Sequence, residues 1–217
     1  LVMVTRNGTV KRIAFTTIAT NRKTGIRALT LEEDDHLISV MRTNGNDNIV
    51  IATAGGMAIC FNEQDVRPMG REAAGVRGIS LSDGDYVIGA EKAEAGKTLL
   101  TVTENGYGKR TELSEYLRLG PSGERIAQGR GGKGLKNYNI TAKTGNVAGC
   151  RVVDETDDVI LIESGGVIIR IPAASINVYK RDTQGVIVMR VEEGNRVIGV
   201  ERITPEVEGE EQAEEGV

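Results

Sequence analysis

One glycine-rich basic segment has the residue types to bind phosphate: Gln128-Gly129-Arg130-Gly131-Gly132-Lys133-Gly134. Glycine lets the backbone approach a phosphate closely and turn its amides outward, while Arg and Lys supply charge and hydrogen-bond donors. The segment is not a nucleotide-binding P-loop, because it lacks the Gly-Lys-Ser/Thr ending and no strand-to-helix context surrounds it. It therefore indicates contact with phosphate groups, and an ordinary flexible loop is the alternative.

Further basic residues recur at equivalent places along the chain. Those that follow tight turns are Lys11, Arg12, Lys109, Arg110 and Arg170. Those in the loops before the later strand pair are Arg22, Lys23, Arg67, Arg71, Arg125, Arg130, Lys180 and Arg181. Those two residues beyond a loop glycine are Arg27, Arg77 and Lys136. Equivalent positions of a repeat lie at equivalent radii, so a recurring charge becomes a stripe that suits a polyanion. Taken singly, each is equally an ordinary solvated charge.

Four copies of one pattern must position these residues. Each copy has an apolar run, a glycine turn, a second apolar run and then a closing pair of strands around an acidic turn. Asn-Gly or Gly-Gly between β-branched runs indicates a tight hairpin. The turn glycines lie 48, 50 and 60 residues apart, at Gly8, Gly56, Gly106 and Gly166. A period near fifty with four strands per unit is typical of a propeller blade.

The pattern predicts an all-β, propeller-like array of four blades over residues 1–204. The expected blades are approximately 1–47, 48–97, 98–157 and 158–204. The third copy is longer: Gly106 to Gly134 spans 28 residues, whereas the matching intervals from Gly8, Gly56 and Gly166 span 17, 19 and 19. The added residues end in the basic segment 128–134.

The formal charge of −4 hides two different parts. Residues 205–217 contain six glutamates and no Lys or Arg, so the rest of the chain has 27 basic against 25 acidic residues, a net of +2. This composition predicts a mildly basic body with a disordered acidic tail. The tail is either inert solubilising sequence or a competitor of a polyanion for the body's basic face.

Composition narrows the class of protein further. Tryptophan is absent and aromatic residues make up 3%, which fits poorly with WD-type and kelch-type blades. Cys60 and Cys150 fall in apolar strand positions and are expected to be buried, reduced thiols of a cytoplasmic protein. His36 stands alone, without metal-ligand spacing, and no signal peptide or membrane-length apolar run occurs.

The repeat and the segment 128–134 together resemble the C-terminal DNA-wrapping domain of the bacterial DNA gyrase A subunit, a type IIA topoisomerase. That family carries a basic box, Gln-Arg-Arg-Gly-Gly-Lys-Gly, which this chain matches except that Gly129 replaces the first arginine. The resemblance covers residues 1 to about 204. Further stretches similar to family motifs are Asn105-Gly106-Tyr107-Gly108-Lys109-Arg110-Thr111, Gly75-Val76-Arg77-Gly78-Ile79 and Asp182-Thr183-Gln184-Gly185-Val186.

The resemblance implies a fold and a size. The family's fold is a β-pinwheel, which is propeller-shaped but exchanges a strand between neighbouring blades. The family's domain has about six blades, so four copies that begin at Leu1 inside an expected strand imply a fragment without the first blades. The box at 128–134 is then a secondary copy that supports wrapping without dominating it.

The resemblance also implies a function: duplex DNA wraps around the basic outer rim and supports ATP-dependent negative supercoiling. The expected partners are double-stranded DNA, the rest of a dimeric A subunit, and the B subunit in an A2B2 complex, near the nucleoid of the bacterial cytoplasm and away from membranes. ATP and Mg²⁺ belong elsewhere in the parent enzyme, and no cofactor or catalytic residue is expected in this chain. With no recognition helix and few aromatics, binding should be nearly sequence-independent and salt-sensitive.

Three other interpretations stay open. The C-terminal domain of the topoisomerase IV A-type subunit is a pinwheel that bends DNA less and lacks a clean box. A protein-binding propeller scaffold predicts an apolar or acidic groove and no salt-sensitive DNA affinity. A propeller enzyme needs converging acid, base or metal ligands, and no such set recurs in the sequence.

Overall fold

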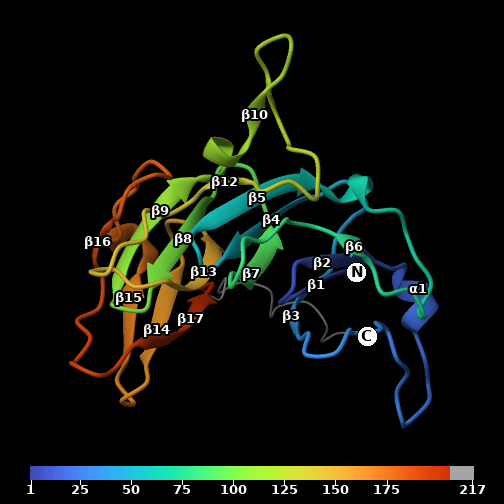
Figure 1. Cartoon of the computed structure of the whole chain (residues 1–217), viewed down its shortest axis with the longest axis horizontal. Helices are drawn as coiled ribbons and strands as arrows, with labels where there is room; N and C mark the ends of the chain where they lie inside the picture. The colour runs from blue at the N-terminus through green and yellow to red at the C-terminus, as the bar shows by residue number, and fades with distance from the viewer. Residues whose placement is uncertain (206–217) are drawn as a thin grey trace, which may run out of the picture.

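The computed structural model describes residues 1–205, and the acidic stretch expected to be disordered lies outside them from residue 206 onward. Four antiparallel sheets stand side by side along an arc, one for each copy of the repeat (Figure 1). No helix among the described residues is long and apolar enough to cross a membrane. The all-β, propeller-like fold with four blades is therefore confirmed.

Each sheet is built on the hairpin that its turn glycine predicted. The hairpins pair β1 with β2, β4 with β5, β8 with β9 and β14 with β15, and an inner strand from later in the same copy joins each of them: β3, β7, β13 and β17. Their bounds are β1 (Val2–Thr5), β2 (Thr9–Arg12), β3 (Leu37–Met41), β4 (Asn48–Thr53), β5 (Met57–Asn62), β7 (Val87–Lys92), β8 (Thr98–Thr103), β9 (Tyr107–Glu112), β13 (Val147–Val153), β14 (Asp158–Glu163), β15 (Ile168–Pro172) and β17 (Val197–Ile203).

The outer strand of each sheet comes from the next copy. β6 (Val76–Arg77) pairs with β2, β12 (Leu135–Lys136) with β5, and β16 (Val186–Ile187) with β9. The sheet orders are therefore β3-β1-β2-β6, β7-β4-β5-β12 and β13-β8-β9-β16. This is the strand exchange that the pinwheel resemblance implied, and it corrects the expectation that both closing strands stay within their own copy.

The first and last copies differ from the two copies between them. The fourth sheet has three strands in the described part of the chain, in the order β17-β14-β15, and no described segment pairs with the outer edge of β15. In the first copy, residues 25–31 match the donor segments in sequence but form no strand. The expectation of four strands in every blade therefore holds for three sheets.

The remaining elements are short. They are the helix α1 (Phe15–Ile18), the 3-10 turns η1 (Glu63–Asp65), η2 (Leu113–Tyr116) and η3 (Ala173–Ser175), and a separate two-stranded hairpin of β10 (Arg118–Leu119) and β11 (Arg125–Ile126). The hairpin of β10 and β11 projects from the outer side of the arc (Figure 1).

The core lies between the sheets. In β4, Ile49 and Ile51 belong to the cluster shared with the first sheet, while Val50 and Ala52 face the third sheet. Successive side chains of a strand point to opposite faces, so a strand that is buried on both sides contributes to two cores. Each blade therefore depends on its neighbours for burial, as expected of a repeat array.

The two cysteines lie in the core between the second and third sheets. Cys60 and Cys150 are both buried and free, as the sequence predicted. Burial raises the pKa of each thiol to about 12, so neither forms a thiolate near neutral pH.

The turn glycines receive the exchanged segment. The carbonyl of Gly56 accepts hydrogen bonds from the amides of Asn137 (2.7 Å) and Tyr138 (3.0 Å), which lie just beyond β12. Gly8 and Gly106 accept equivalent pairs of amides from the copies that follow them. Gly56 has a φ of +82°, and a Cβ there would lie 2.7 Å from the Tyr138 carbonyl oxygen. Glycine is thus required at this turn both by its conformation and by the approach of the next copy.

We expect Gly56→Val to lower the free energy of unfolding more than Gly84→Val does. Both glycines have positive φ, so both variants carry left-handed strain of about 1–2 kcal/mol. Only at Gly56 does the new side chain also meet the neighbouring copy's backbone, which adds about 1–3 kcal/mol. Urea denaturation of the two variants measures the difference; equal losses would remove the docking role of this turn.

Candidate nucleic-acid interface

The basic segment 128–134 crosses from the third copy onto the second. The backbone amide of Gln128 donates to the carbonyl of Cys60 at 2.7 Å, and Gln128 forms a parallel bridge with Phe61. Pro68 and Val178 make the equivalent bridges to Arg12 and Arg110. The segment is therefore the third copy's version of a crossing that each junction between blades contains, and not a free loop.

Backbone hydrogen bonds also hold the glycines of this segment. The amide of Gly131 donates to the carbonyl of Gly78 at 2.6 Å, and the amide of Ser80 donates to the carbonyl of Gly132 at 2.9 Å. Gly134 has a φ of +73°, and its Cα lies so close to Ala58 that a Cβ would overlap the Ala58 carbonyl. The glycines of the segment thus serve the crossing itself, by their hydrogen bonds or by their close approach to the second copy.

The two charged residues of the segment differ in their surroundings. Arg130 is exposed, yet its guanidinium donates to the carbonyls of Asp65 (2.8 Å) and Arg77 (3.0 Å). Lys133 is exposed, and it follows the glycine pair that bonds to the second copy. Arg130 therefore positions the segment with part of its hydrogen-bonding capacity, and Lys133 presents its charge to solvent.

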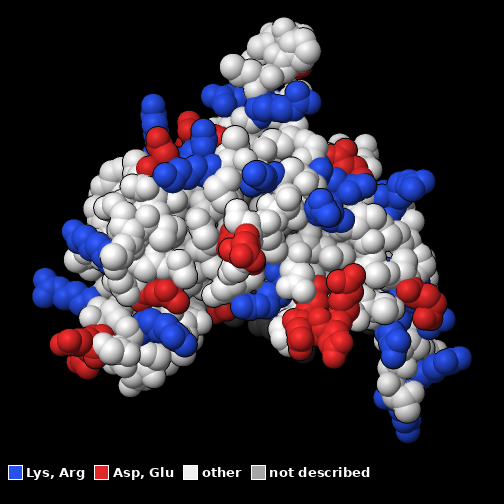
Figure 2. Space-filling view, viewed as in Figure 1, with Lys and Arg blue, Asp and Glu red and all other residues white. Residues whose placement is uncertain are grey.

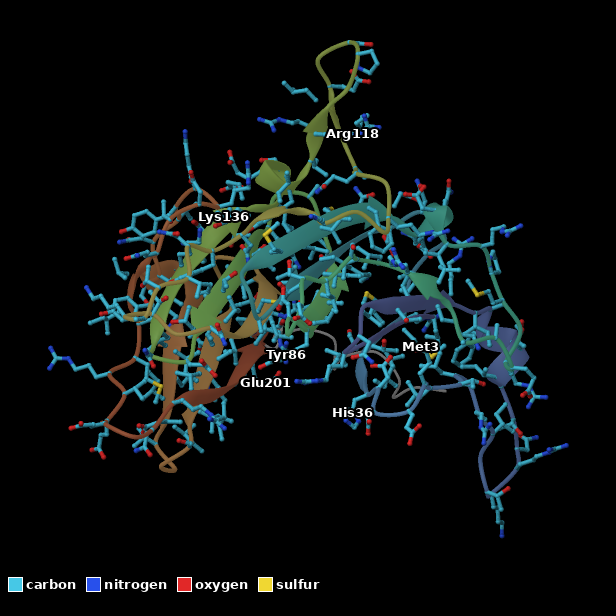
Figure 3. The ribbon with its side chains drawn as sticks, viewed as in Figure 1. Met3, His36, Tyr86, Arg118, Lys136 and Glu201 are labelled. Atoms are coloured by element: carbon cyan, nitrogen blue, oxygen red, sulfur yellow. The ribbon has the colours of Figure 1, made fainter. Side chains whose placement is uncertain are left out.

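The exchanged strands bring two further predicted residues to the outer edge. Arg77 on β6 lies opposite Thr9, and Lys136 on β12 lies opposite Met57. Both side chains are exposed, and Figure 3 shows Lys136 at the outer side of the array. Their common spacing from a loop glycine thus places them at equivalent positions, as the repeat predicted. Ile187 takes this position on β16, so the series of charges ends at the third sheet.

Most of the other predicted basic residues are at least partly accessible to solvent. Arg22, Lys23, Arg27 and Lys180 are among the exposed or half-buried side chains, as are Arg12, Arg71, Arg170 and Arg181. Arg12 lies 3.5 Å from the buried carboxylate of Glu63, and Arg170 pairs with Asp158 at 2.6 Å. Figure 2 shows Lys and Arg along the outer edge of the arc with a few Asp and Glu among them, while the largest group of Asp and Glu lies on the inner side, where some Lys and Arg also occur.

Three of the predicted residues are not on this surface. Lys11, Lys109 and Arg110 are buried, at 0%, 0% and 4% exposure. The Lys11 ammonium donates to the carbonyls of Ala28, Arg71 and Ala73. Each of these side chains points under a loop, where backbone carbonyls of the crossing segments take its hydrogen bonds. The prediction that they contact a polyanion is wrong, because charge alone does not show which side of a strand faces solvent.

The equivalent lysine of the third copy joins the third and fourth blades. The Lys109 ammonium donates to the carbonyls of Lys180 and Arg181, both at 2.6 Å. The Arg110 Nε donates to the carbonyl of Ile176 at 2.7 Å. Burial lowers the pKa of Lys109 to about 7, and the negative charge of Asp182 only partly opposes this. These side chains stabilise the junctions between blades.

The structure also shows two candidate residues that the repeat analysis missed, Arg118 and Leu119, next to Arg125, which that analysis included. The hairpin of β10 and β11 carries Arg118, Leu119 and Arg125 on the exposed surface, shortly before segment 128–134. Figure 3 shows Arg118 on this hairpin, clear of the body of the protein. The sequence contains a signal for it, a Gly-Pro-Ser-Gly turn at 120–123 between two short runs. The repeat obscured that signal, because no other copy has these residues.

A family model described as the DNA gyrase C-terminal domain, beta-propeller, matches this chain over residues 1–44, 47–94, 97–154 and 157–204. The chain belongs to this family. Among curated proteins, it is 42% identical over 208 residues to the DNA gyrase A subunit of Staphylococcus epidermidis, a match that covers 95% of the chain and 22% of that protein. It is 39% identical over 209 residues to the A subunit of Salmonella typhimurium, covering 96% of the chain and 23% of that protein.

Solved structures agree with this assignment. The C-terminal domain of DNA topoisomerase IV superposes with a TM-score of 0.84 at 26% identity, over 94% of this chain and 61% of that one. A DNA gyrase A C-terminal domain superposes with a TM-score of 0.76 at 25% identity, over 93% of this chain and 64% of that one. The gyrase-family chain thus spans less than a quarter of the curated relatives, and less than two thirds of each of these solved domains.

We expect Lys109 to make the stability of this gyrase-family domain depend on pH. Because the pKa of Lys109 is about 7 in the folded chain and about 10.4 in an unfolded one, the unfolded chain binds an extra proton between these values. The free energy of unfolding should therefore rise with pH in this window, by up to about 1 kcal/mol per pH unit.

The measurement compares urea denaturation at pH 7 and pH 9 for the unmodified chain and Lys109→Met. The advantage of the unmodified chain should increase at pH 9. Lys136→Met is the matched control, since Lys136 is exposed and its replacement should leave the pH profile unchanged. An advantage that stays constant or falls would show that Lys109 remains charged in the fold.

Proposed function

We propose that this chain binds duplex DNA along the outer edge of its sheets and bends it, as a wrapping module of a DNA gyrase A subunit. The observation that carries the proposal is the recurrence of exposed basic side chains at the junctions between blades. Arg77 and Lys136 occupy equivalent positions on exchanged strands, and Lys133 lies in the crossing between them. Because the blades lie along an arc, charges at equivalent positions form a curved track.

The energetics of bending agree with such a track. Bending a site of 20–30 base pairs through 40–90° costs about 1–6 kcal/mol. Each phosphate contact releases condensed counterions, so several lysines and arginines together can offset this cost at moderate salt. The candidate residues lie on strands and turns, without a recognition helix in the described part of the chain, which favours contact with phosphates over reading of bases.

The curated relatives, which are named as A subunits of DNA gyrase, support the proposed role of the parent protein. In the proposed assembly, the chain is the C-terminal part of an A subunit that pairs with a B subunit in an A2B2 complex, in the bacterial cytoplasm at the nucleoid. Cleavage, Mg²⁺ binding and ATP hydrolysis belong to other parts of that enzyme. We take residues 1–204 as one array of four blades. Its proposed DNA contacts are segment 128–134 and the exposed or half-buried basic residues of the candidate interface.

A second candidate is the equivalent domain of topoisomerase IV. The higher TM-score to the topoisomerase IV domain favours it, 0.84 against 0.76. The sequence favours gyrase, because the family model, the curated relatives and six of the seven box residues agree. The two candidates differ in how strongly they bend DNA, so a bending measurement separates them.

The first test uses energy transfer between dyes at the two ends of a duplex, with the chain added across a salt series. We expect transfer to rise on binding and to fall steeply as salt increases, because binding depends on released counterions. Binding without a rise in transfer would favour a weaker bender, and no binding at low salt would overturn the proposal.

A second prediction concerns the basic segment. We expect Arg130→Glu combined with Lys133→Glu to reduce bending and to lower the salt dependence of log K by about 0.9 for each phosphate that is no longer neutralised. Lys133→Glu alone leaves the hydrogen bonds of Arg130 intact, so its effect is free of any local rearrangement. Charge reversal at the exposed Glu32 and Glu33 is the control. If reversal of these two glutamates increases bending by as much as reversal of Arg130 and Lys133 reduces it, net charge, and not this segment, governs bending.

A further inference from the structure

The hairpin of β10 and β11 is the most protruding element on the outer side of the arc (Figure 1). Arg118 pairs with Ile126 and Leu119 pairs with Arg125, so the ribbon is two residue pairs deep below its turn. The turn closes with hydrogen bonds from Gly120 to Glu124 (2.7 Å) and from Gly123 to Gly120 (3.0 Å). A duplex that follows the outer edge must meet this ribbon.

The base of the hairpin is firmly attached to the body. On one side, Leu113 and Tyr116 of η2 are buried. On the other side, Gln128 bonds to Cys60 through its backbone. The Gln128 side chain then donates to the carbonyl of Tyr116 at 2.8 Å, which joins the two ends of the hairpin. The ribbon therefore projects in a defined direction instead of moving as a loose loop.

The side chains of the ribbon suit a groove that is walled by phosphates. Leu119 is 66% exposed, with no covering from the body. Residues that lie directly opposite in an antiparallel pair share a face, and successive residues alternate. Arg118 with Ile126 therefore forms one face, and Leu119 with Arg125 forms the other. Each face of the ribbon carries one arginine and one apolar side chain.

We propose that this hairpin enters the major groove of the bound duplex. The inference rests on the proposed DNA binding and assigns it a groove. A two-stranded β-ribbon fits the major groove, which is about 12 Å wide and 8.5 Å deep, whereas the minor groove is about 6 Å wide. From the pair of Arg118 and Ile126 to the turn is about three residues, roughly 10 Å of extended strand, which matches the depth.

In this arrangement the two arginines contact opposite walls of the groove. Arg118 and Arg125 lie on opposite faces of the ribbon, so they reach the two phosphate backbones that flank it. The turn lies against the base edges, and Leu119, which is next to the turn on the same face as Arg125, lies low on that wall, where the C5-methyl group of thymine offers an apolar surface. The hairpin thereby holds the duplex in one rotational setting on the rim without requiring a particular sequence. One arginine on each face suits the two phosphate backbones that flank a groove and disfavours a basic or apolar protein partner of the ribbon.

The test fills the major groove chemically. Binding is compared on an unmodified duplex and on one in which each cytosine carries a glucosylated 5-hydroxymethyl group, which projects into the major groove. The chain is compared with a trimmed variant in which residues 119–125 are replaced by two glycines. Netropsin, which occupies the minor groove, is added to the unmodified duplex in a parallel series. Thermal melting of each variant checks that the trimmed chain keeps its fold.

We expect the unmodified chain to bind the filled duplex about tenfold more weakly, and the trimmed variant to bind both duplexes alike, because it no longer has the ribbon or Arg125. Arg22→Ala combined with Lys23→Ala is the matched control, since it removes two exposed charges elsewhere and should keep the sensitivity to the filled groove.

The outcomes separate the two proposals. Equal weakening of the unmodified and trimmed chains on the filled duplex would overturn the groove assignment and leave DNA binding in place. Sensitivity to netropsin that disappears on trimming would overturn it in favour of the minor groove. Affinity unchanged by both the filled groove and trimming would also overturn it and leave the ribbon free for a protein partner. Failure of every variant to bind the unmodified duplex would overturn DNA binding itself.

Discussion

The pairing of each hairpin with a strand from the following copy is the constraint on which the rest of the structure depends. A hairpin leaves one strand edge with unpaired amides and carbonyls, and such an edge must be covered or it will pair elsewhere. Here β6, β12 and β16 cover the edges of the first three sheets, and the turn glycines accept two further amides from the same incoming segments. Successive blades are therefore joined by backbone hydrogen bonds as well as by apolar packing.

This exchange also determines where the charges lie. A segment that reaches the neighbouring blade must cross the outer side of the array, because the inner side is occupied by β3, β7, β13 and β17 (Figure 1). Basic residues on the crossing segments are then presented at the outer edge. Segment 128–134 illustrates the consequence: its glycines fit the crossing, Arg130 secures it, and Lys133 remains exposed. The same residues thus serve the architecture and the proposed DNA contact.

The buried lysines show how the architecture limits reasoning from charge. Lys11 and Lys109 lie at equivalent positions, and at the corresponding places the other two copies have Ile59 and Ile169. The position is an inward one, and in two copies a lysine serves there because crossing loops offer carbonyl oxygens to its ammonium group. A buried charge is tolerated only when its donors are satisfied in this way. The alternation of Lys with Ile was the signal in the sequence that the position faces inward.

The sequence by itself determined the local elements and their number. Asn-Gly and Gly-Gly turns at a regular spacing specify hairpins, because their conformation depends on neighbouring residues alone, and the repeat of that pattern specifies a stacked array. The match to the basic box identified segment 128–134 from residue identity. The tertiary structure decided three further features. They are the copy that receives a given strand, the lysines that face the core, and the distance to which the hairpin of β10 and β11 projects. Those features depend on contacts between residues that are distant along the chain, and no local propensity encodes such contacts.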